Sequence, residues 1–188
     1  MKNRLWITGY RSFELNIFKD DDPKIKVIKR AIQDTLINKL ENNDLVWVIT
    51  GGQLGVEQWS AEVALKLKRK HFQIKLAVIL PFKDFGKRWN KEHKEKLSLI
   101  IKKADFSALA SHKNYYSPFQ FKDYQKFLFR HTDGTLMVYD PDHRGKSNYD
   151  YRFIKIQQKR YPRYDFNLIN FDYLEDLAQD IKEEKYPW

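Results

Sequence analysis

The chain has 188 residues, of which 42% are hydrophobic and 32% charged, and its formal net charge is +10. The length suits one domain, and the composition is that of a globular protein rather than a disordered or collagenous one. The absence of cysteine excludes a disulfide framework, a thiolate metal site and a thiol nucleophile. The positive charge attracts polyanions of every kind, so it does not distinguish nucleic acid, nucleotides and an acidic partner. We expect a single domain over residues 1–188.

No targeting or membrane segment is predicted. The chain opens on Met1-Lys2-Asn3-Arg4 and continues into an apolar stretch that is too short for a signal peptide. No apolar run in the sequence reaches the length of a membrane span. We therefore expect a cytoplasmic protein that does not associate with a membrane.

Short apolar runs alternate along the chain with stretches of helical periodicity. The runs expected to form strands are 5–7, 45–49, 74–80, 106–110, 135–139 and 166–169. The stretches expected to form helices are 25–40, 54–70, 85–103, 118–130, a segment after Ser147 and a C-terminal segment from Asp172. Strands separated by helices at this spacing imply right-handed crossovers. The sequence predicts an α/β fold with a Rossmann-like, mostly parallel sheet flanked by helices on both faces.

The turn after the first predicted strand reads Thr8-Gly9-Tyr10-Arg11. In an open parallel sheet, ligands bind beyond the carboxyl ends of the strands, where helix N-termini also direct free N–H groups. Gly9 lets the backbone approach a ligand closely, and Arg11 supplies a forked cation for phosphate or carboxylate. The same pattern also suits an ordinary turn with a surface arginine.

The turn after the second predicted strand, Thr50 to Glu57, holds three of the seven glycines of the chain. Gly51 and Gly52 allow positive φ in a tight turn, and Gly55 allows close helix packing or close approach of a ligand. The helix that begins there offers N–H groups to a phosphate. The spacing is neither G-x-G-x-x-G nor a Walker loop, which argues against ordinary dinucleotide dehydrogenases and P-loop NTPases.

Glu57 is the candidate catalytic residue. Its carboxylate suits a hydrogen bond to a ribose hydroxyl, or chemistry at a glycosidic carbon. A helix N-terminal acid favoured by the helix dipole is an equally good interpretation.

The polar loop from Tyr139 to Ser147 follows the fifth predicted strand. Ser147 is placed to cap the next helix, and Gly145, Lys146 and Ser147 together suit a second phosphate or the far side of the ligand. Asp142 and His143 are too few for a metal site, so no metal is expected. The predicted ligand-binding residues are Thr8, Gly9, Tyr10, Arg11, Gly51, Gly52, Gln53, Gly55, Glu57, Asp140, Gly145 and Ser147.

Two further features bear on nucleic acid. The runs 24–30 and 66–70 are basic at helical spacing, which is most simply explained by solvated helix faces. The segment 112–121 is rich in aromatic and basic residues, which suits stacking on bases, although packing against the sheet edge explains it as well.

Several of these motifs, in this order, resemble the YpsA-like proteins. They are Thr8-Gly9-Tyr10-Arg11 with Phe13-Glu14-Leu15 and Ile17-Phe18, Gly52 to Glu57 with Trp59 and Ala61-Glu62, Ser117 to Lys122, and Asp133-Gly134 with Tyr139-Asp140-Pro141. The resemblance implies a domain of the SLOG superfamily, similar to the DNA-processing protein DprA and to the LOG phosphoribohydrolases. It also implies nucleotide or nucleotide-derived ligands, with Gly9 and Arg11 in one binding turn and Gly51, Gly52, Gly55 and Glu57 in another. The YpsA-like family is associated with bacterial cell-division control.

The chain departs from both relatives. It lacks the Pro-Gly-Gly-x-Gly-Thr-x-x-Glu motif of the LOG enzymes, so their reaction is not implied. It has no room for the additional domains of DprA, and Glu57 stands where DprA has an aspartate.

Three functions therefore remain open. The first is a protein that binds or senses a nucleotide-type ligand such as ADP-ribose or an NAD-like compound across the two glycine turns. The second is an N-glycosidic hydrolase in which Glu57 stabilises an oxocarbenium-like sugar while Arg11 holds phosphate. The third is a single-stranded nucleic-acid binder. A protein partner and a homo-oligomer are also left open.

Overall fold

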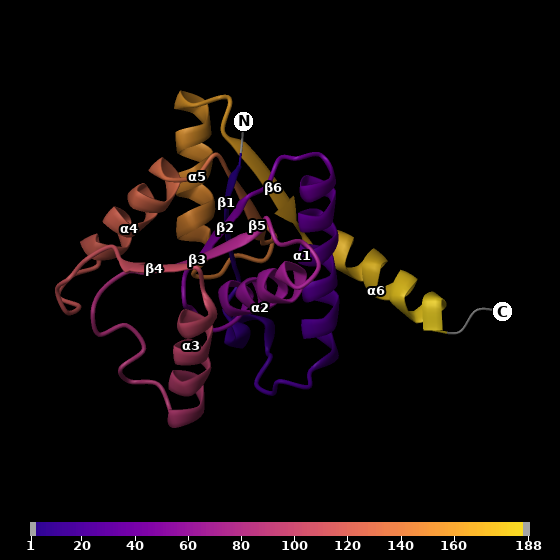
Figure 1. Cartoon of the computed structure of the whole chain (residues 1–188), viewed down its shortest axis with the longest axis horizontal. Helices are drawn as coiled ribbons and strands as arrows, with labels where there is room; N and C mark the ends of the chain where they lie inside the picture. Colours follow the sequence, from indigo (N-terminus) through magenta and orange to yellow (C-terminus); the bar gives the residue numbers. More distant parts are fainter. Residues whose placement is uncertain (1–2, 186–188) are drawn as a thin grey trace.

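The computed structural model describes residues 3–185, which form one six-stranded, all-parallel sheet with helices on both sides (Figure 1). The strands are β1 (Arg4–Gly9), β2 (Trp47–Thr50), β3 (Lys75–Leu80), β4 (Phe106–Leu109), β5 (Gly134–Val138) and β6 (Asp165–Ile169). The helices are α1 (Pro23–Glu41), α2 (Val56–Lys68), α3 (Lys91–Lys103), α4 (Phe119–Arg130), α5 (Asn148–Arg160) and α6 (Phe171–Lys185), with a short 3-10 helix η1 (Ser12–Leu15). The predicted Rossmann-like α/β class is confirmed.

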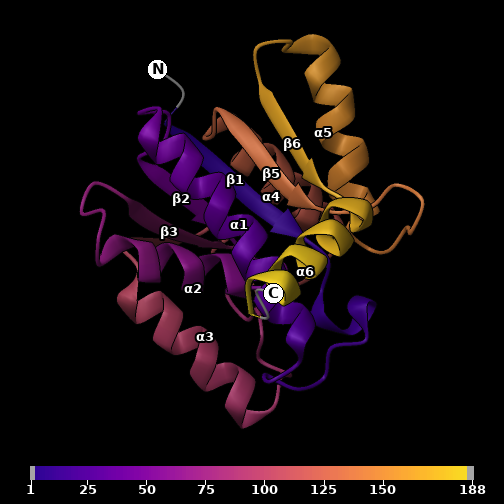
Figure 2. The ribbon, with the colours of Figure 1, turned by 90° about the vertical axis from the view of Figure 1, so that its right-hand side faces the viewer.

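The strand order is β4-β3-β2-β1-β5-β6. The chain therefore steps outward from β1 to β4, then crosses back and continues on the other side of β1 with β5. Helices α1, α2 and α6 pack on one face, and α4 and α5 cover the other (Figures 1 and 2). The strand order reverses between β1 and β5, and ligand crevices of open α/β sheets lie at such a point.

Helix α1 shows how local sequence sets an element. Asp22 accepts a hydrogen bond from the Lys24 N–H at 2.9 Å, and Pro23 occupies the first helical position. Five apolar residues at helical spacing are buried on the sheet side, as predicted: Ile25, Ile28, Ile32, Leu36 and Leu40.

Helix α3 begins later than predicted. Residues 85–89 form turns, with Gly86 at φ 75°, and the helix starts only after Asn90, whose side chain accepts from the His93 N–H at 2.8 Å. The aromatic rings of Phe85 and Trp89 pack edge to face with centroids 5.2 Å apart. Tertiary packing of these rings, rather than helix periodicity, explains the apolar positions before Asn90.

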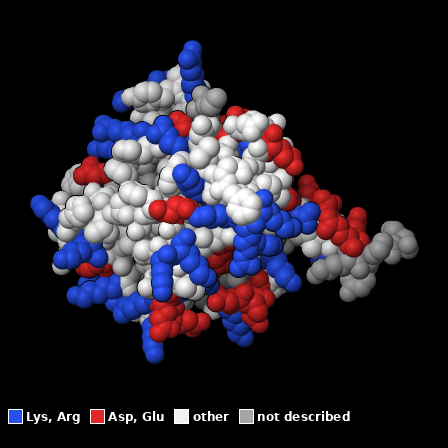
Figure 3. Space-filling view, in the orientation of Figure 1, with Lys and Arg blue, Asp and Glu red and all other residues white. Residues whose placement is uncertain are grey.

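Basic side chains are distributed over the surface, interspersed with acidic ones over much of the face shown in Figure 3. In the two basic runs picked out from the sequence, three cations are neutralised by ion pairs, namely Lys29 with Glu62, Arg30 with Asp34, and Lys68 with Asp105. These ion pairs are consistent with the prediction that both runs lie on solvated helix faces. No helix within residues 3–185 is long and apolar enough to cross a membrane.

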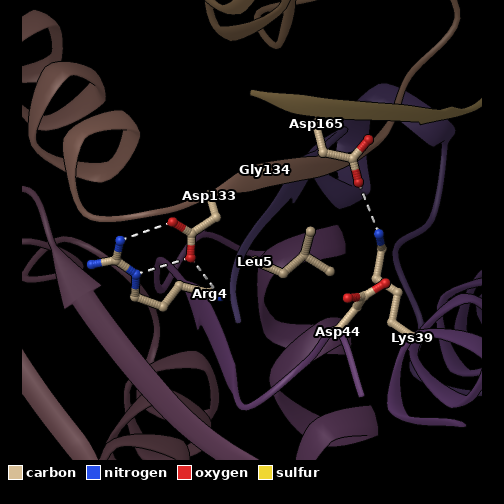
Figure 4. Close-up of a pocket in the computed structure, with 7 residues that line it drawn as sticks. All are labelled: Arg4, Leu5, Lys39, Asp44, Asp133, Gly134 and Asp165. Carbon is tan, nitrogen blue, oxygen red and sulfur yellow. Dashed lines mark hydrogen bonds and ion pairs between the residues drawn. The ribbon is translucent and has the colours of Figure 1, made fainter. Parts of the chain in front are cut away.

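The amino end of the sheet is held by charged pairs around a small cavity of about 40 Å³ (Figure 4). The Arg4 guanidinium donates to both carboxylate oxygens of Asp133, at 3.0 and 2.9 Å, and Lys39 pairs with Asp165 at 2.9 Å. These contacts join β1 to the start of β5, and α1 to the start of β6. They tie strands and helix together at the edge of the sheet opposite to the carboxyl edge, where ligands of this architecture bind.

Candidate functional site

The two glycine turns lie side by side at the carboxyl edge of the sheet. Arg11 and Gly55 form an antiparallel bridge, with the Val56 N–H donating to Tyr10 O at 3.1 Å and the Ser12 N–H to Leu54 O at 3.3 Å. Gly55 has φ 108°, and a Cβ there would lie 2.6 Å from both Ser12 N and Tyr10 O. Only glycine fits at this junction, so Gly55 joins the two turns.

Gly51 and Gly52 have a different role from the one predicted. Neither has a positive φ, so the tight-turn explanation was wrong. A Cβ on Gly51 would lie 2.2 Å from Glu57 Oε2, and one on Gly52 would lie 2.7 Å from side-chain atoms of Leu80 and Leu97. The missing side chains leave room for the Glu57 carboxyl group and for packing of α3.

Two carboxyl groups meet at the end of the central strand β1. Thr8 Oγ1 lies 3.1 Å from Glu57 Oε1 and 3.3 Å from Asp150 Oδ2. Glu57 is in the first turn of α2 and Asp150 in the first turn of α5, so they reach Thr8 from opposite faces of the sheet. We refer to Glu57 and Asp150 as the carboxyl pair.

The remaining oxygens of the carboxyl pair also accept hydrogen bonds. The Gln53 N–H donates to Glu57 Oε2 at 2.9 Å, and the Gln125 amide donates to Asp150 Oδ1. Thr8 has a single hydroxyl proton and donates it to only one carboxylate at a time. When the carboxyl pair holds one proton, the protonated carboxyl group donates to Thr8 Oγ1 while Thr8 donates to the other carboxylate. Both contacts of Thr8 are then hydrogen bonds.

Burial favours this protonated state. Burial, followed by the neighbouring Asp150 charge, raises the pKa of Glu57, while the Gln53 N–H, Thr8 and Arg11 lower it, and together these effects bring the pKa to about 7. Burial also raises the pKa of Asp150. Perturbed carboxyl groups at the carboxyl edge of an α/β sheet are a signature of a functional site.

Arg11 is the cation of this site. Its side chain is half-buried, and its charge acts on both members of the carboxyl pair. Within residues 3–185, however, its guanidinium makes no hydrogen bond or ion pair. A partly buried guanidinium with all its donors available is suited to an anionic group.

The second glycine turn also presents unused N–H groups. Those of Gly52, Gly55 and Glu57 donate to no partner within residues 3–185. Gly55 is the N-cap residue of α2 and Glu57 lies in its first turn, where free N–H groups and the helix dipole favour negative charge.

Four predicted residues form internal contacts instead. The Tyr10 hydroxyl accepts from the Asp140 N–H at 3.0 Å and lies 2.5 Å from the His143 carbonyl oxygen. The Asp140 carboxylate accepts from the N–H groups of Asp142 and Phe171, and Ser147 Oγ donates to Gly9 O at 2.7 Å. Ser147 precedes α5 but does not cap it with its side chain, contrary to prediction. Tyr10, Asp140, Ser147 and Gly9 thus fix the loops around the site.

Glu14, which was named in a family motif but not predicted as a site residue, joins the loop after β1 to the loop after β5. Its Oε2 accepts from the Arg11 N–H at 2.8 Å, and its Oε1 accepts from the Lys146 N–H. A Cβ on Gly145 would lie 2.2 Å from Glu14 Oε1, so Gly145 makes room for this carboxylate. The loop predicted to hold a second phosphate is therefore already bonded to an internal anion.

A separate cavity of about 630 Å³ lies on the α1 and α6 side of the same edge. Its lining residues include Tyr10, Glu14, Ile28, Arg144, Phe171 and Leu174. Neither member of the carboxyl pair lines it, nor does Arg11. The predicted site residues are thus divided between the carboxyl-pair site and the wall of this cavity.

Comparison with known proteins identifies the family to which the chain belongs. The YpsA family model, described as the YspA SLOG family, matches residues 5–174. The chain belongs to the YpsA SLOG family. Similar relatives of this family are UPF0398 proteins of Oenococcus oeni, 51% identical over the whole of both chains, and of Lactobacillus delbrueckii subsp. bulgaricus, 48% identical over 98% of this chain and 99% of the relative. The UPF0398 protein of Lactiplantibacillus plantarum is 45% identical over 97% of this chain and 96% of its own length.

Around the carboxyl pair of this YpsA family member, three residues were not predicted from the sequence. Asp150, Gln125 and Tyr124 come from α5 and α4, and the Tyr124 hydroxyl would lie 2.5 Å from a Cβ on Gly51. Asp150 carried one usable signal, an acid in the first turn of a helix that follows a central strand. Within residues 3–185, no three His, Cys, Asp or Glu side chains are grouped to hold a metal ion.

Proposed function

We propose that the carboxyl edge binds a phosphate-bearing nucleotide or nucleotide-derived ligand, of the ADP-ribose or NAD type. The observation that carries this proposal is the half-buried guanidinium of Arg11 beside the carboxyl pair, which has no hydrogen-bond or ion-pair partner among the described residues. The guanidinium and the free N–H groups of the α2 N-terminus suit a phosphate, and carboxyl oxygens suit sugar hydroxyls. A phosphorylated sugar combines both requirements.

Titration calorimetry with ADP-ribose, NAD, AMP and ribose 5-phosphate tests the proposal, with adenosine as the phosphate-free comparison. We expect the phosphorylated compounds to bind more tightly than adenosine, and Arg11→Ala to weaken them at least tenfold, since charge-assisted hydrogen bonds contribute about 1.5–3 kcal/mol. Arg69→Ala is the matched control, because Arg69 is exposed at the far end of α2. Absence of binding by every compound, or equal binding by Arg11→Ala, would overturn the proposal.

The carboxyl pair favours a second function, cleavage of an N-glycosidic bond. One carboxyl that keeps a proton near neutral pH and one nearby that is ionised can divide the roles of general acid and electrostatic stabiliser. Release of free base from AMP or NAD, followed by chromatography, tests for this reaction. We expect Glu57→Gln to abolish release while retaining ligand binding. Binding without any release by the unaltered protein would leave the binding function alone.

A further inference from the structure

Helix α5 differs from the other helices in its charges. Beyond its first turn, which contains Asp150, its charged residues are all basic: Arg152, Lys155, Lys159 and Arg160. All four are exposed, and none forms an ion pair within residues 3–185. Arg163 in the following loop extends the series. The outer face of α5 is thus an uncompensated line of positive charge.

The basic runs 24–30 and 66–70 differ from α5, because acidic residues on α1 and α2 pair with some of their cations. Helices α1 and α2 carry Asp34 and Glu62 among their lysines and arginines, and these acids form ion pairs with Arg30 and Lys29. In Figure 3, Lys and Arg side chains lie over α4 and α5 at the upper left, with fewer acidic side chains among them than at the bottom of the view. Beyond its first turn, α5 therefore lacks the acidic residues that pair with cations on α1 and α2.

Apolar and aromatic side chains lie exposed within the same line. Tyr149 is 76% exposed at the start of α5, Ile156 is 53% exposed near its middle and Tyr161 is 57% exposed at its end. A helix rises 1.5 Å per residue, so the two tyrosines are about 18 Å apart along the axis. Exposed aromatic rings between arginines suit stacking on unpaired bases, a contact that an acidic polypeptide does not provide.

We propose that the outer face of α5, formed by Tyr149, Arg152, Lys155, Ile156, Lys159 and Arg160 together with Tyr161 at its end, binds single-stranded nucleic acid. The arginines and lysines contact phosphates, and the tyrosines stack on bases. This surface lies outside the carboxyl-pair site, and binding to it does not require Arg11.

Fluorescence anisotropy of a labelled twelve-nucleotide oligothymidylate, titrated with protein at several salt concentrations, tests the surface. If four phosphates are neutralised, log Kd should change with log salt concentration with a slope of about 3, at about 0.7 for each phosphate of a single strand. Arg152→Glu with Lys159→Glu should weaken binding at least tenfold and reduce this slope. Circular dichroism checks that the variant is folded.

The matched control is Lys102→Glu with Lys103→Glu, which makes the same change in net charge on exposed residues of α3. Equal loss in both double variants would show a general effect of net charge and overturn the proposal. Tyr149→Ala with Tyr161→Ala should weaken binding without changing the salt slope. If the tyrosine variant binds normally and polyglutamate competes as well as unlabelled oligothymidylate, the surface recognises acidic polypeptide and the proposal fails. Arg11→Ala should bind the oligonucleotide normally.

Discussion

The carboxyl groups of Glu57 and Asp150 share one hydrogen-bond partner, the Thr8 hydroxyl group. Thr8 lies between them and donates a single proton, and burial raises the pKa of both carboxyl groups. Sequence reasoning found Glu57 because it stands beside three glycines. It missed Asp150, since an acid in the first turn of a helix is ordinary, and only the crossover from β5 brings this one to Thr8. The local pattern predicted half of the pair.

The raised pKa of Glu57 predicts a particular dependence of stability on pH. Between the ordinary value of 4.5 and about 7, the folded protein binds a proton that the unfolded chain releases, so stability falls as pH rises through this interval. Glu57→Gln removes this titration. We expect the variant to be more stable than the parent at pH 8, on the order of 1–3 kcal/mol, with little difference at pH 4.5.

Urea unfolding at pH 4.5, 6 and 8, followed by tryptophan fluorescence, measures this effect. Glu92→Gln, at an exposed position in the first turn of α3, is the control and should leave the pH dependence unchanged. A Glu57→Gln variant that is less stable than the parent at pH 8 would contradict the assignment of a protonated pair.

At the scale of elements, the site depends on the junction between the first two strand-to-helix turns. Sequence reasoning placed both turns correctly at one edge, because the carboxyl ends of parallel strands meet there. It assigned the wrong reason to Gly51 and Gly52, since the atoms that approach them belong to Glu57, Leu80 and Leu97. Such approaches depend on packing between distant segments, which no local pattern contains.

The junction itself predicts an unequal effect of two similar substitutions. Gly55→Ala places a methyl group 2.6–2.8 Å from the backbone of residues 10–12 at φ 108°, so the turns must separate, and we expect a loss of about 3 kcal/mol or more. Gly86→Ala also has a positive φ, but its methyl group meets only the Trp89 ring at 3.1 Å, and we expect a loss of about 1 kcal/mol. Urea unfolding of both variants compares them. Equal losses would show that φ alone, and not contact between the turns, determines the cost.

At the scale of the whole molecule, the sheet with its two helical faces could be predicted because each strand is a short apolar run bounded by helical periodicity. The strand order could not, since nothing in the local sequence states that β5 returns beside β1. The sequence also could not show which basic side chains form ion pairs and which do not. A count of 35 basic residues gives the total but not which cations the fold pairs with acids.

The excess of ten positive charges predicts that salt stabilises the protein as a whole. Repulsion between like charges destabilises the compact state, and added salt screens it. We expect the thermal unfolding midpoint to rise by a few degrees between 20 and 300 mM sodium chloride. Differential scanning calorimetry measures this, with choline chloride as a check on specific cation effects. A falling midpoint would show that surface ion pairs outweigh the repulsion.

The Glu14 carboxylate has a consequence for how the edge of the sheet is prepared. By accepting from the Arg11 and Lys146 N–H groups, it supplies an intramolecular counter-anion that ties the β1 and β5 loops together. The conformation of these loops therefore does not depend on a bound ligand. A ligand that binds at this edge therefore meets loops that are already ordered, and its binding free energy is not reduced by the entropy of ordering them.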